Sequence, residues 1–368
     1  MAEDNSTCTH LSVAMTTDDV DATQTATANT MTSSSSIDAQ FYFFCAVVIM
    51  GVVGTAGNAL ILYALMAAKQ HKKHPLIVNQ NVLDLFGSFF LVVSYAVKLC
   101  DIRYVGALGY WLCVTLYSEV LVAYGTYGSR INIAAVTVER YLKVVHSTWS
   151  KKKLRSWMIN STMAFSWLMP IAVLTPVLLT TSGVEDGVCF DFGYASKDMT
   201  FVYMVWYLLS FYVIIFTIFI VCYGHMLVAI RRQAKVMAAY SAAGLNTSQT
   251  QSNEMQINVI KTMILVCALY ILSHIPQAVV YVDLIVGSNL LVHGSVYDVS
   301  RIIQFLYVTA NPFVYAVKFD PVRKVLKDMI PSGMVVRFNH AMSRLTLRGS
   351  RAVTDSGDQE LADMRTRV

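Results

Sequence analysis

The sequence predicts an all-α membrane protein: a seven-transmembrane helix bundle followed by a short amphipathic eighth helix. Of its 368 residues, 55% are hydrophobic and only 14% are charged, whereas a soluble domain carries about 25% charged residues. The apolar residues gather into runs of about 20 or more, the length at which a helix crosses a bilayer. The ten-residue alternation of a transmembrane barrel is absent. The seven runs cover residues 41–67, 77–99, 111–142, 157–180, 201–230, 259–286 and 299–318.

Residues 1–40, before the first run, are predicted to form a disordered extracellular tail. They are rich in Ser and Thr, acidic, and free of Lys and Arg, so they cannot bury a core. They also lack the basic segment and apolar core of a signal peptide. Asn5-Ser6-Thr7 matches the acceptor pattern for N-glycosylation.

Lys and Arg set the predicted orientation. They gather after the first, third and fifth runs, for example at Lys72, Lys152 and Arg231, and again after the seventh. By the positive-inside rule, the N-terminus lies outside and the C-terminus inside, in a multi-pass protein of the plasma membrane. The net charge of +5 reflects this bias, so no nucleic-acid partner is expected.

Two cysteines are predicted to face the oxidising side of the membrane, where disulfides persist. Cys113 starts the third run, and Cys189 lies in the outer loop after the fourth. We expect a Cys113–Cys189 bond, with Cys100 as a competitor for either partner. Cys8 is left over.

Polar residues inside the spans are costly and usually functional. The first span holds Asn58, the second Asp84, and the fourth Trp167. The remaining signals are Glu139-Arg140-Tyr141 ending the third span, Tyr223 in the fifth, Pro276 in the sixth, and Asn311-Pro312-x-x-Tyr315 in the seventh.

This set of motifs, each in its proper span and order, resembles the rhodopsin-like (class A) G-protein-coupled receptors over residues 41–330. The stretches "ERYLKVVHS" and "QINVIKTMILV" look most like orphan-type members from invertebrate animals. The resemblance implies a receptor, not an enzyme. Such a receptor binds an extracellular ligand and activates a heterotrimeric G protein by moving its sixth helix. An arrestin and a receptor kinase are the further implied partners.

By this resemblance, Arg140 is restrained by Glu139 and released to meet the G protein, because a buried arginine with competing partners defines two states. The alternative is an interfacial arginine that snorkels to lipid phosphates. Where many relatives carry a second restraining Glu in the sixth helix, this chain has Gln256. A neutral partner restrains less, so appreciable ligand-free signalling is predicted. The same switch includes Tyr141, Tyr223, Asn311, Pro312 and Tyr315.

Asp84 resembles the acid that binds an allosteric sodium ion in the family, with Asn58, Ser129, Asn311 and Tyr315 as its partners. Carboxylate, hydroxyl and amide oxygens suit a hard cation. The alternative is a structural polar network without an ion. No other cofactor is expected.

Arg130 departs from the family pattern, because a second arginine lies ten residues before Arg140, deep in the third span. An unpaired charge at that depth is expensive. Asp84 or Glu119 is the expected partner; pairing with Asp84 would replace the sodium ion.

The sixth-helix hinge is also altered. Pro276 removes one backbone hydrogen bond and should kink the helix. His274 stands where the family has Trp, with Tyr270 before it. It is either a pH-sensitive group or a neutral packing residue. The fifth span lacks the family's proline, which leaves its bulge in doubt.

After the seventh span, Asp320-Pro321 should start the amphipathic helix, residues 320–330, on the inner leaflet. Residues 331–368 should form a disordered cytoplasmic tail whose Ser and Thr residues can be phosphorylated. The terminal Thr366-Arg367-Val368 fits the pattern bound by PDZ proteins.

A ligand pocket should open between the outer helix ends. The acidic excess there favours a cationic amine or peptide. Against a simple amine, Val122 stands where amine receptors carry Asp. Cys113 lies 27 residues before Arg140, two more than usual, so the outer third helix should be offset. Candidate lining residues are Glu119, Tyr124, Tyr281, Asp283, Tyr297, Asp298, Arg301 and Gln304, with Glu185, Asp186 and Asp191 from the loops.

Three other functions fit less well. An opsin needs a Lys in the seventh span, but Phe305 matches that position and Lys318 lies at the inner end. A membrane transporter would show repeated halves or broken helices. An intramembrane hydrolase would need clustered catalytic residues, whereas His225 and His274 are isolated.

Overall fold

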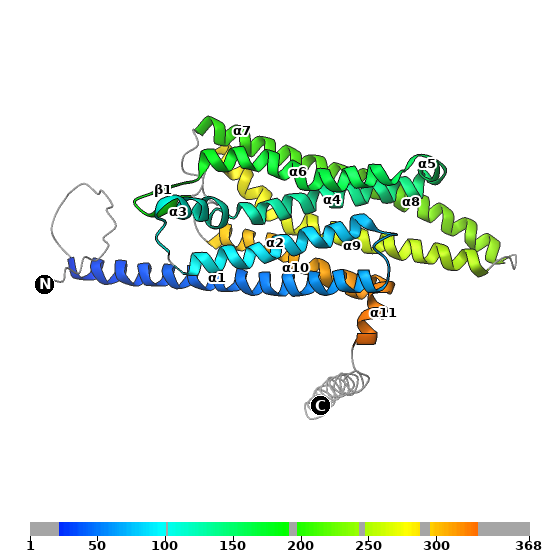
Figure 1. Ribbon diagram of the computed structural model, residues 1–368, viewed down its shortest axis with the longest axis horizontal. Coiled ribbons are helices and arrows are strands. Elements are labelled where there is room, and N and C mark those ends of the chain that lie inside the picture. The colour runs from blue at the N-terminus through cyan, green and yellow to red at the C-terminus, as the bar shows by residue number, and fades with distance from the viewer. Residues whose placement is uncertain (1–21, 101, 191–196, 243–246, 288–294, 330–368) are drawn as a thin grey trace, which may run out of the picture.

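A computed structural model describes residues 22–100, 102–190, 197–242, 247–287 and 295–329 (Figure 1). Asn5, Cys8, Asp191 and the tail 331–368 lie outside these residues. The chain is a bundle of long helices that run side by side, with one small hairpin (Figure 1). The helices are α1 (Ala22–Ala67), α2 (Pro75–Leu99), α3 (Gly106–Leu112), α4 (Val120–Val145), α5 (Ser147–Lys153), α6 (Ser156–Thr181), α7 (Lys197–Leu208), α8 (Ile215–Ala242), α9 (Thr247–Val286), α10 (Ser295–Lys318) and α11 (Asp320–Met329), with π-helices η1 (Cys113–Tyr117) and η2 (Leu209–Ile214).

Six spans within the described residues are long and apolar enough to cross a membrane by themselves. A seventh, in α10, qualifies only together with α11, to which it is joined through a bend of 84°. The six spans agree closely with the predicted runs, so the seven-transmembrane bundle is confirmed. They are Ala39–Ala67, Pro75–Leu99, Gly106–Val145, Ser156–Pro176, Phe201–Arg232 and Ile264–Val286.

Helix α1 begins at Ala22, although its apolar span begins only at Ala39. The backbone of residues 22–40 is therefore helical, in the segment that the sequence assigned to a tail. In Figure 1 this part of α1 projects past the bundle at the end where α3 and β1 lie, which we call the outer end.

The third span is interrupted near its outer end. The chain passes from α3 into η1, leaves the helix at Ser118, and re-enters at α4 after Glu119, whose φ is 59°. Left-handed backbone is rare for a residue with a side chain, so this is a fixed break. It absorbs the two surplus residues between Cys113 and Arg140, and the predicted offset of the outer third helix is confirmed.

The fifth span keeps a bulge without a proline. The π-helix η2 lies between α7 and α8 and adds one residue to the helical turn. The bulge in the fifth span is therefore present, although the family's proline is missing.

The outer loop after α6 forms a hairpin of β1 (Gly183–Glu185) and β2 (Val188–Phe190), which the sequence did not predict. Asp186 and Gly187 join the strands with φ of 51° and 79°, the backbone of a tight two-residue turn. Cys189 of β2 forms the disulfide with Cys113, as predicted, while Cys100 is a free, exposed thiol.

Helices α2 and α4 cross at two glycines. A Cβ atom on Gly125 would lie 2.6 Å from the Gly87 Cα atom, inside contact distance. Because the two backbones touch here, side chains one turn further in, among them Asp84 and Ser129, can meet.

Helix α11 follows α10 where the amphipathic helix was predicted. Val322 is fully buried on the bundle, Val325 and Leu326 pack beside it, and Arg323, Lys324 and Lys327 are exposed. Its position on a membrane leaflet stays a prediction.

Candidate functional site

Arg140 lies at the inner end of α4 and is only 9% exposed. Its Nε atom is 3.7 Å from Oε2 of Glu139, and Nζ of Lys143 lies 2.5 Å from Oε1 of the same carboxylate. Glu139 is thus shared between two cations, so its restraint on Arg140 is only partial.

A second restraint on Arg140 comes from His74, the residue before α2. The Nη2 atom of Arg140 lies 2.7 Å from His74 Nδ1, and the imidazole packs edge-on against the Phe319 ring at 5.7 Å. Burial first, and then the charges of Arg140, Lys143 and Lys73, lower the pKa of His74 to about 3. The imidazole is therefore neutral, and Nδ1 can accept the hydrogen bond that Arg140 donates.

Sequence reasoning missed His74. The only signal was its place before Pro75 at the start of a span. The predicted partner, Gln256, lies on α9, and its side chain is outside what the structure describes.

Tyr223 lies behind the switch, in a polar contact among three helices. Its hydroxyl is 3.1 Å from Thr137 Oγ1 of α4 and 3.2 Å from Cys267 Sγ of α9. Tyr315 is buried in the same apolar cluster. Tyr141 instead turns toward the loop, where its hydroxyl lies 3.2 Å from His146 Nε2.

Asp84 is buried at the centre of the bundle. Its carboxylate accepts hydrogen bonds from Ser129 Oγ at 2.6 Å and from Asn311 Nδ2 at 2.9 Å. Gln80, which the sequence did not single out, donates to both carboxylate oxygens at 3.3 Å. Three helices thus meet at this one acid.

Asn58 differs from its predicted role as a partner of Asp84. Its amide donates to the backbone carbonyls of Gly54 at 2.9 Å and Val308 at 3.4 Å, so it ties α1 to α10 directly. Pro312 of α10 packs against Gly57 next to it.

Arg130 is 1% exposed, and its predicted pairing with Asp84 or Glu119 is wrong. Its Nη1 atom donates a hydrogen bond to the Tyr207 hydroxyl. The guanidinium also lies over the rings of Tyr127, at 5.0 Å, and Tyr207, at 5.8 Å. Both acids are already satisfied by other groups, so aromatic rings hold this cation.

The hinge residues of α9 pack against the fifth span. The Tyr270 hydroxyl donates to the backbone carbonyl of Phe211 in η2 at 3.0 Å. The His274 ring stacks on Tyr270 at 4.2 Å, and its Nδ1 lies 2.8 Å from the Tyr270 carbonyl. A carbonyl accepts only from a protonated nitrogen, so Nδ1 carries a proton, and the buried, stacked ring fits a packing residue.

Glu119, at the break between η1 and α4, is 8% exposed and lies between two cations. Lys98 from α2 and Arg301 from α10 each form a salt bridge with one of its carboxylate oxygens. We call Lys98, Glu119 and Arg301 the outer triad. Sequence reasoning named Glu119 and Arg301 as separate ligand contacts and did not single out Lys98.

Two of the remaining ligand candidates, Tyr281 and Tyr297, lie near enough to Arg301 to interact with its charge, as Glu119 does. The Tyr124 hydroxyl bonds to Thr175 of α6 at 2.8 Å, whereas the Tyr281 ring lies against Tyr207 at 5.0 Å. The Tyr297 ring lies 5.7 Å from the Arg301 guanidinium. Asp298 and Gln304 on α10, and Asp283 on α9, are partly exposed.

Apolar helices long enough to cross a membrane, a buried arginine in contact with Glu139 and His74, a buried acid and a loop tied by a disulfide are the features of a membrane receptor. The sequence pattern of the family described as 7 transmembrane receptor (rhodopsin family) matches residues 57–315, and the chain belongs to this family. It is a multi-pass membrane receptor and not an enzyme.

The similar proteins are named as different kinds of receptor, among them opsins and a chemokine receptor. Melanopsin-A of Gadus morhua is 24% identical over 78% of this chain, and the match spans only 52% of that protein. Compound eye opsin BCRH1 of Hemigrapsus sanguineus is 23% identical over 77% of this chain and 76% of its own. C-C chemokine receptor type 8 of Homo sapiens is 23% identical over 81% and 80%. Such a mixture at low identity does not define a ligand.

Proposed function

We propose that the protein is a cell-surface receptor that binds an extracellular ligand and activates a heterotrimeric G protein through movement of α9. The contact that supports this most is that of Arg140 with Glu139 and His74. One buried guanidinium shared between a carboxylate and a neutral imidazole has alternative partners, which is what a two-state switch requires. The N-terminus lies outside in this proposal, with the basic inner loops facing the G protein.

Movement of α9 has a physical route. Tyr270 and His274 fix α9 to the π-helix of the fifth span, and Pro276 lies two residues further on, where the backbone lacks one hydrogen bond. Breaking the Tyr270–Phe211 contact would release α9 from this anchor. Cys267, one turn inward, contacts Tyr223 and Thr137, so a shift there reaches the α4 switch.

The test is G-protein activation by the full chain in cell membranes against a panel of G-protein subtypes. The Arg140→Ala variant should lose ligand-free activation, while the exposed Arg155→Ala variant should keep it at equal surface expression. The proposal is refuted if Arg140→Ala activates the G protein as strongly as the unchanged chain does. It is also refuted if neither the unchanged chain nor His74→Ala activates any subtype.

The opsin alternative is favoured by the similarity to opsins, but the chain lacks the residue that opsin chemistry needs. The only lysine of α10 is Lys318, its last residue. Phe305, at the position that matches the Schiff-base lysine of opsins, is buried against the Tyr95 ring at 6.1 Å. We therefore favour a diffusible ligand over bound retinal.

We further propose an allosteric sodium ion held by Asp84, Ser129 and Asn311. The Oδ1 atom of Asn311 is buried without a hydrogen-bond partner, and it belongs to the side chain that already donates to Asp84. A sodium ion would use this oxygen together with the carboxylate and hydroxyl oxygens. The ion would join α2, α4 and α10.

On the inner side, phosphorylation of the tail by a receptor kinase and binding of an arrestin are the expected means of ending the signal. The last three residues are proposed as a PDZ ligand. These proposals rest on the sequence of a tail outside the described residues.

A further inference from the structure

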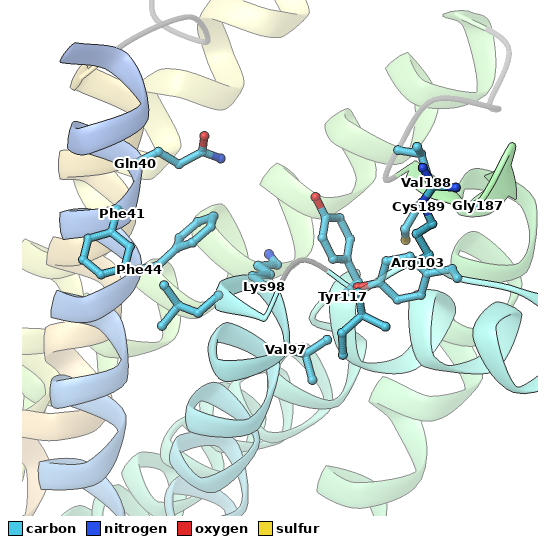
Figure 2. Close-up of a pocket in the computed structure, with 13 residues that line it drawn as sticks. Gln40, Phe41, Phe44, Val97, Lys98, Arg103, Tyr117, Gly187, Val188 and Cys189 are labelled. Carbon is cyan, nitrogen blue, oxygen red and sulfur yellow. The ribbon is translucent and has the colours of Figure 1, made fainter. Parts of the chain in front are cut away.

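A cavity of about 620 Å³ opens at the outer end of the bundle (Figure 2). It lies between α1, the outer end of α2, η1 and the β1–β2 hairpin. Its size is within the range of about 300–1,000 Å³ that is typical of small-molecule sites. The walls are Gln40, Phe41, Phe44, Val97, Lys98, Leu99, Ile102, Arg103, Tyr104, Tyr117, Gly187, Val188 and Cys189.

The charged side chains in these walls are both cationic: Lys98 and Arg103. No carboxylate is among the described wall residues. Glu119 lies behind Lys98 and takes up one positive charge through the outer triad. The exposed Glu185 and Asp186 precede Gly187 on the hairpin, and Asp101 lies outside the described residues. The described wall residues and the outer triad together hold three cations, Lys98, Arg103 and Arg301, against one acid, Glu119, so the site is net positive.

Apart from Gln40, the other side chains in the walls are apolar or aromatic. Phe41 and Phe44 of α1 form one side, and Figure 2 shows Lys98 between Phe44 and Tyr117, with Arg103 further toward the hairpin. The hairpin side is fixed, because Cys189 is bonded to Cys113. A ligand that fits should bring a negatively charged group to the lysine and arginine, and an apolar body to α1.

We propose that this cavity binds an amphipathic carboxylate, with the carboxylate at Lys98 and Arg103 and the apolar body against Phe41 and Phe44. A carboxylate matches this positive charge, and charge-assisted hydrogen bonds from ammonium and guanidinium to carboxylate are the strong kind. The expectation of a cationic ligand depended on acids such as Glu119, whose charge is already neutralised by Lys98 and Arg301.

Binding there has a route into the bundle, a step that rests on the proposed receptor function. Lys98 can give its hydrogen bonds to the ligand or to Glu119, so the ligand competes with Glu119 for this ammonium. Glu119 then depends more on Arg301 of α10, and the link between α2 and α4 weakens. The ligand would thus weaken the contact of Glu119 with α2 relative to its contact with α10, without reaching the centre of the bundle.

The test uses the full chain in lipid nanodiscs and two pairs of probes that differ in the sign of their charge. Oleate is compared with oleylamine, and indole-3-acetate with tryptamine. Binding is measured by equilibrium dialysis, without a G protein. We expect saturable binding of at least one carboxylate, and at least tenfold weaker binding of its amine counterpart. Binding of oleate alone points to a membrane-derived ligand, and binding of indole-3-acetate alone to a water-borne one.

The variants are Lys98→Gln and Arg103→Gln, with the exposed Lys72→Gln between α1 and α2 as the control. Each cavity variant should weaken carboxylate binding at least tenfold, and the control should not. Lys98→Gln also removes a partner of Glu119, but Arg103 is exposed and its replacement spares the fold. The inference fails if both carboxylates fail to bind, if the amines bind equally well, or if Arg103→Gln binds as the unchanged chain does. Because no G protein is present, failure of the signalling proposal would leave this result intact.

Discussion

The guanidinium of Arg130 donates a hydrogen bond to the hydroxyl of Tyr207, so α4 is tied to α7 by a cation and a phenol. The rings of Tyr127 and Tyr207 lie beside the same charge. Aromatic faces attract a cation by electrostatics, which explains how a fully buried arginine persists without a carboxylate beside it. The contact also fixes α7 directly before the π-helix to which Tyr270 is bonded.

Tyr207→Phe should lower stability by about 1–3 kcal/mol, because one buried N–H of Arg130 loses its acceptor. Thermal unfolding of the purified receptor in detergent measures this. Tyr212→Phe is the matched control: the Tyr212 hydroxyl is buried with no hydrogen-bond partner, so its removal should cost little. Equal melting temperatures for the two variants would contradict the role of the hydroxyl.

His74→Ala should raise ligand-free G-protein activation severalfold. Removing the imidazole takes away the acceptor 2.7 Å from Arg140 Nη2 and leaves only the shared Glu139 to restrain it. Nucleotide exchange in membranes, normalised to surface expression, is the measurement. The exposed Arg155, before α6, provides the control variant Arg155→Ala. Unchanged basal exchange in His74→Ala would show that His74 restrains nothing.

The same histidine should make stability depend on pH. The pKa of His74 is about 3 in the folded chain, against the usual 6.5. Between these values the unfolded chain binds more protons, so the free energy of unfolding falls as pH falls below about 6.5. Above that pH the imidazole is neutral in both states and has no effect.

Melting curves at pH 7.5 and pH 5.5 test this for the unchanged chain, His74→Gln and His225→Gln. The glutamine at position 74 keeps an acceptor for Arg140 but cannot titrate, so this variant should lose less stability at pH 5.5. If all three chains lose the same stability between pH 7.5 and pH 5.5, His74 is not the source of the pH dependence.

Asp84→Asn should abolish any specific effect of sodium. In the unchanged chain, sodium chloride should raise the melting temperature above that in choline chloride of equal ionic strength, because a ligand of the folded state stabilises it. The asparagine has no charge to hold the ion. The sodium site is wrong if both chains respond to the two salts alike.

Gly125→Ala should destabilise the receptor by about 1–3 kcal/mol, because the new methyl would lie 2.6 Å from the Gly87 Cα atom and a backbone cannot turn aside. Gly224→Ala on α8 meets nothing within 4 Å and should be neutral, or stabilising by up to about 1 kcal/mol. Thermal unfolding of both variants is the check. A Gly125→Ala chain as stable as Gly224→Ala would mean that α2 and α4 do not touch here.

The long apolar runs predicted the spans, and membrane sidedness predicted the disulfide, because both follow from composition along the chain. The salt bridges were not predictable in the same way. Lys98, Glu119 and Arg301 come from three helices, and their meeting depends on how each helix is rotated about its axis. For Glu119, the direction of the side chain depends on the left-handed break before α4, which the spacing from Cys113 to Arg140 indicated only as an offset.

The failure at Arg130 has a similar cause. A buried cation was expected to seek an acid, and the sequence offered two. The tyrosines that hold it, Tyr127 and Tyr207, were indistinguishable in sequence from ordinary core residues. His74 was hidden for another reason: its role comes from desolvation beside Arg140, and a lone histidine before a proline carries no sign of that.

The left-handed turn at Glu119 also divides the third span into two parts with separate registers. Inward of it, α4 keeps the spacing that aligns Ser129 with Asp84 and Arg140 with His74. Outward of it, residues 106–118 are anchored by Cys113 to the hairpin and not by continuity of the helix. Insertions or deletions on the outer side therefore need not rotate the inner machinery. Residues 106–118 can therefore change in sequence or length, by evolution or by design, to recognise new ligands while α4 keeps its register.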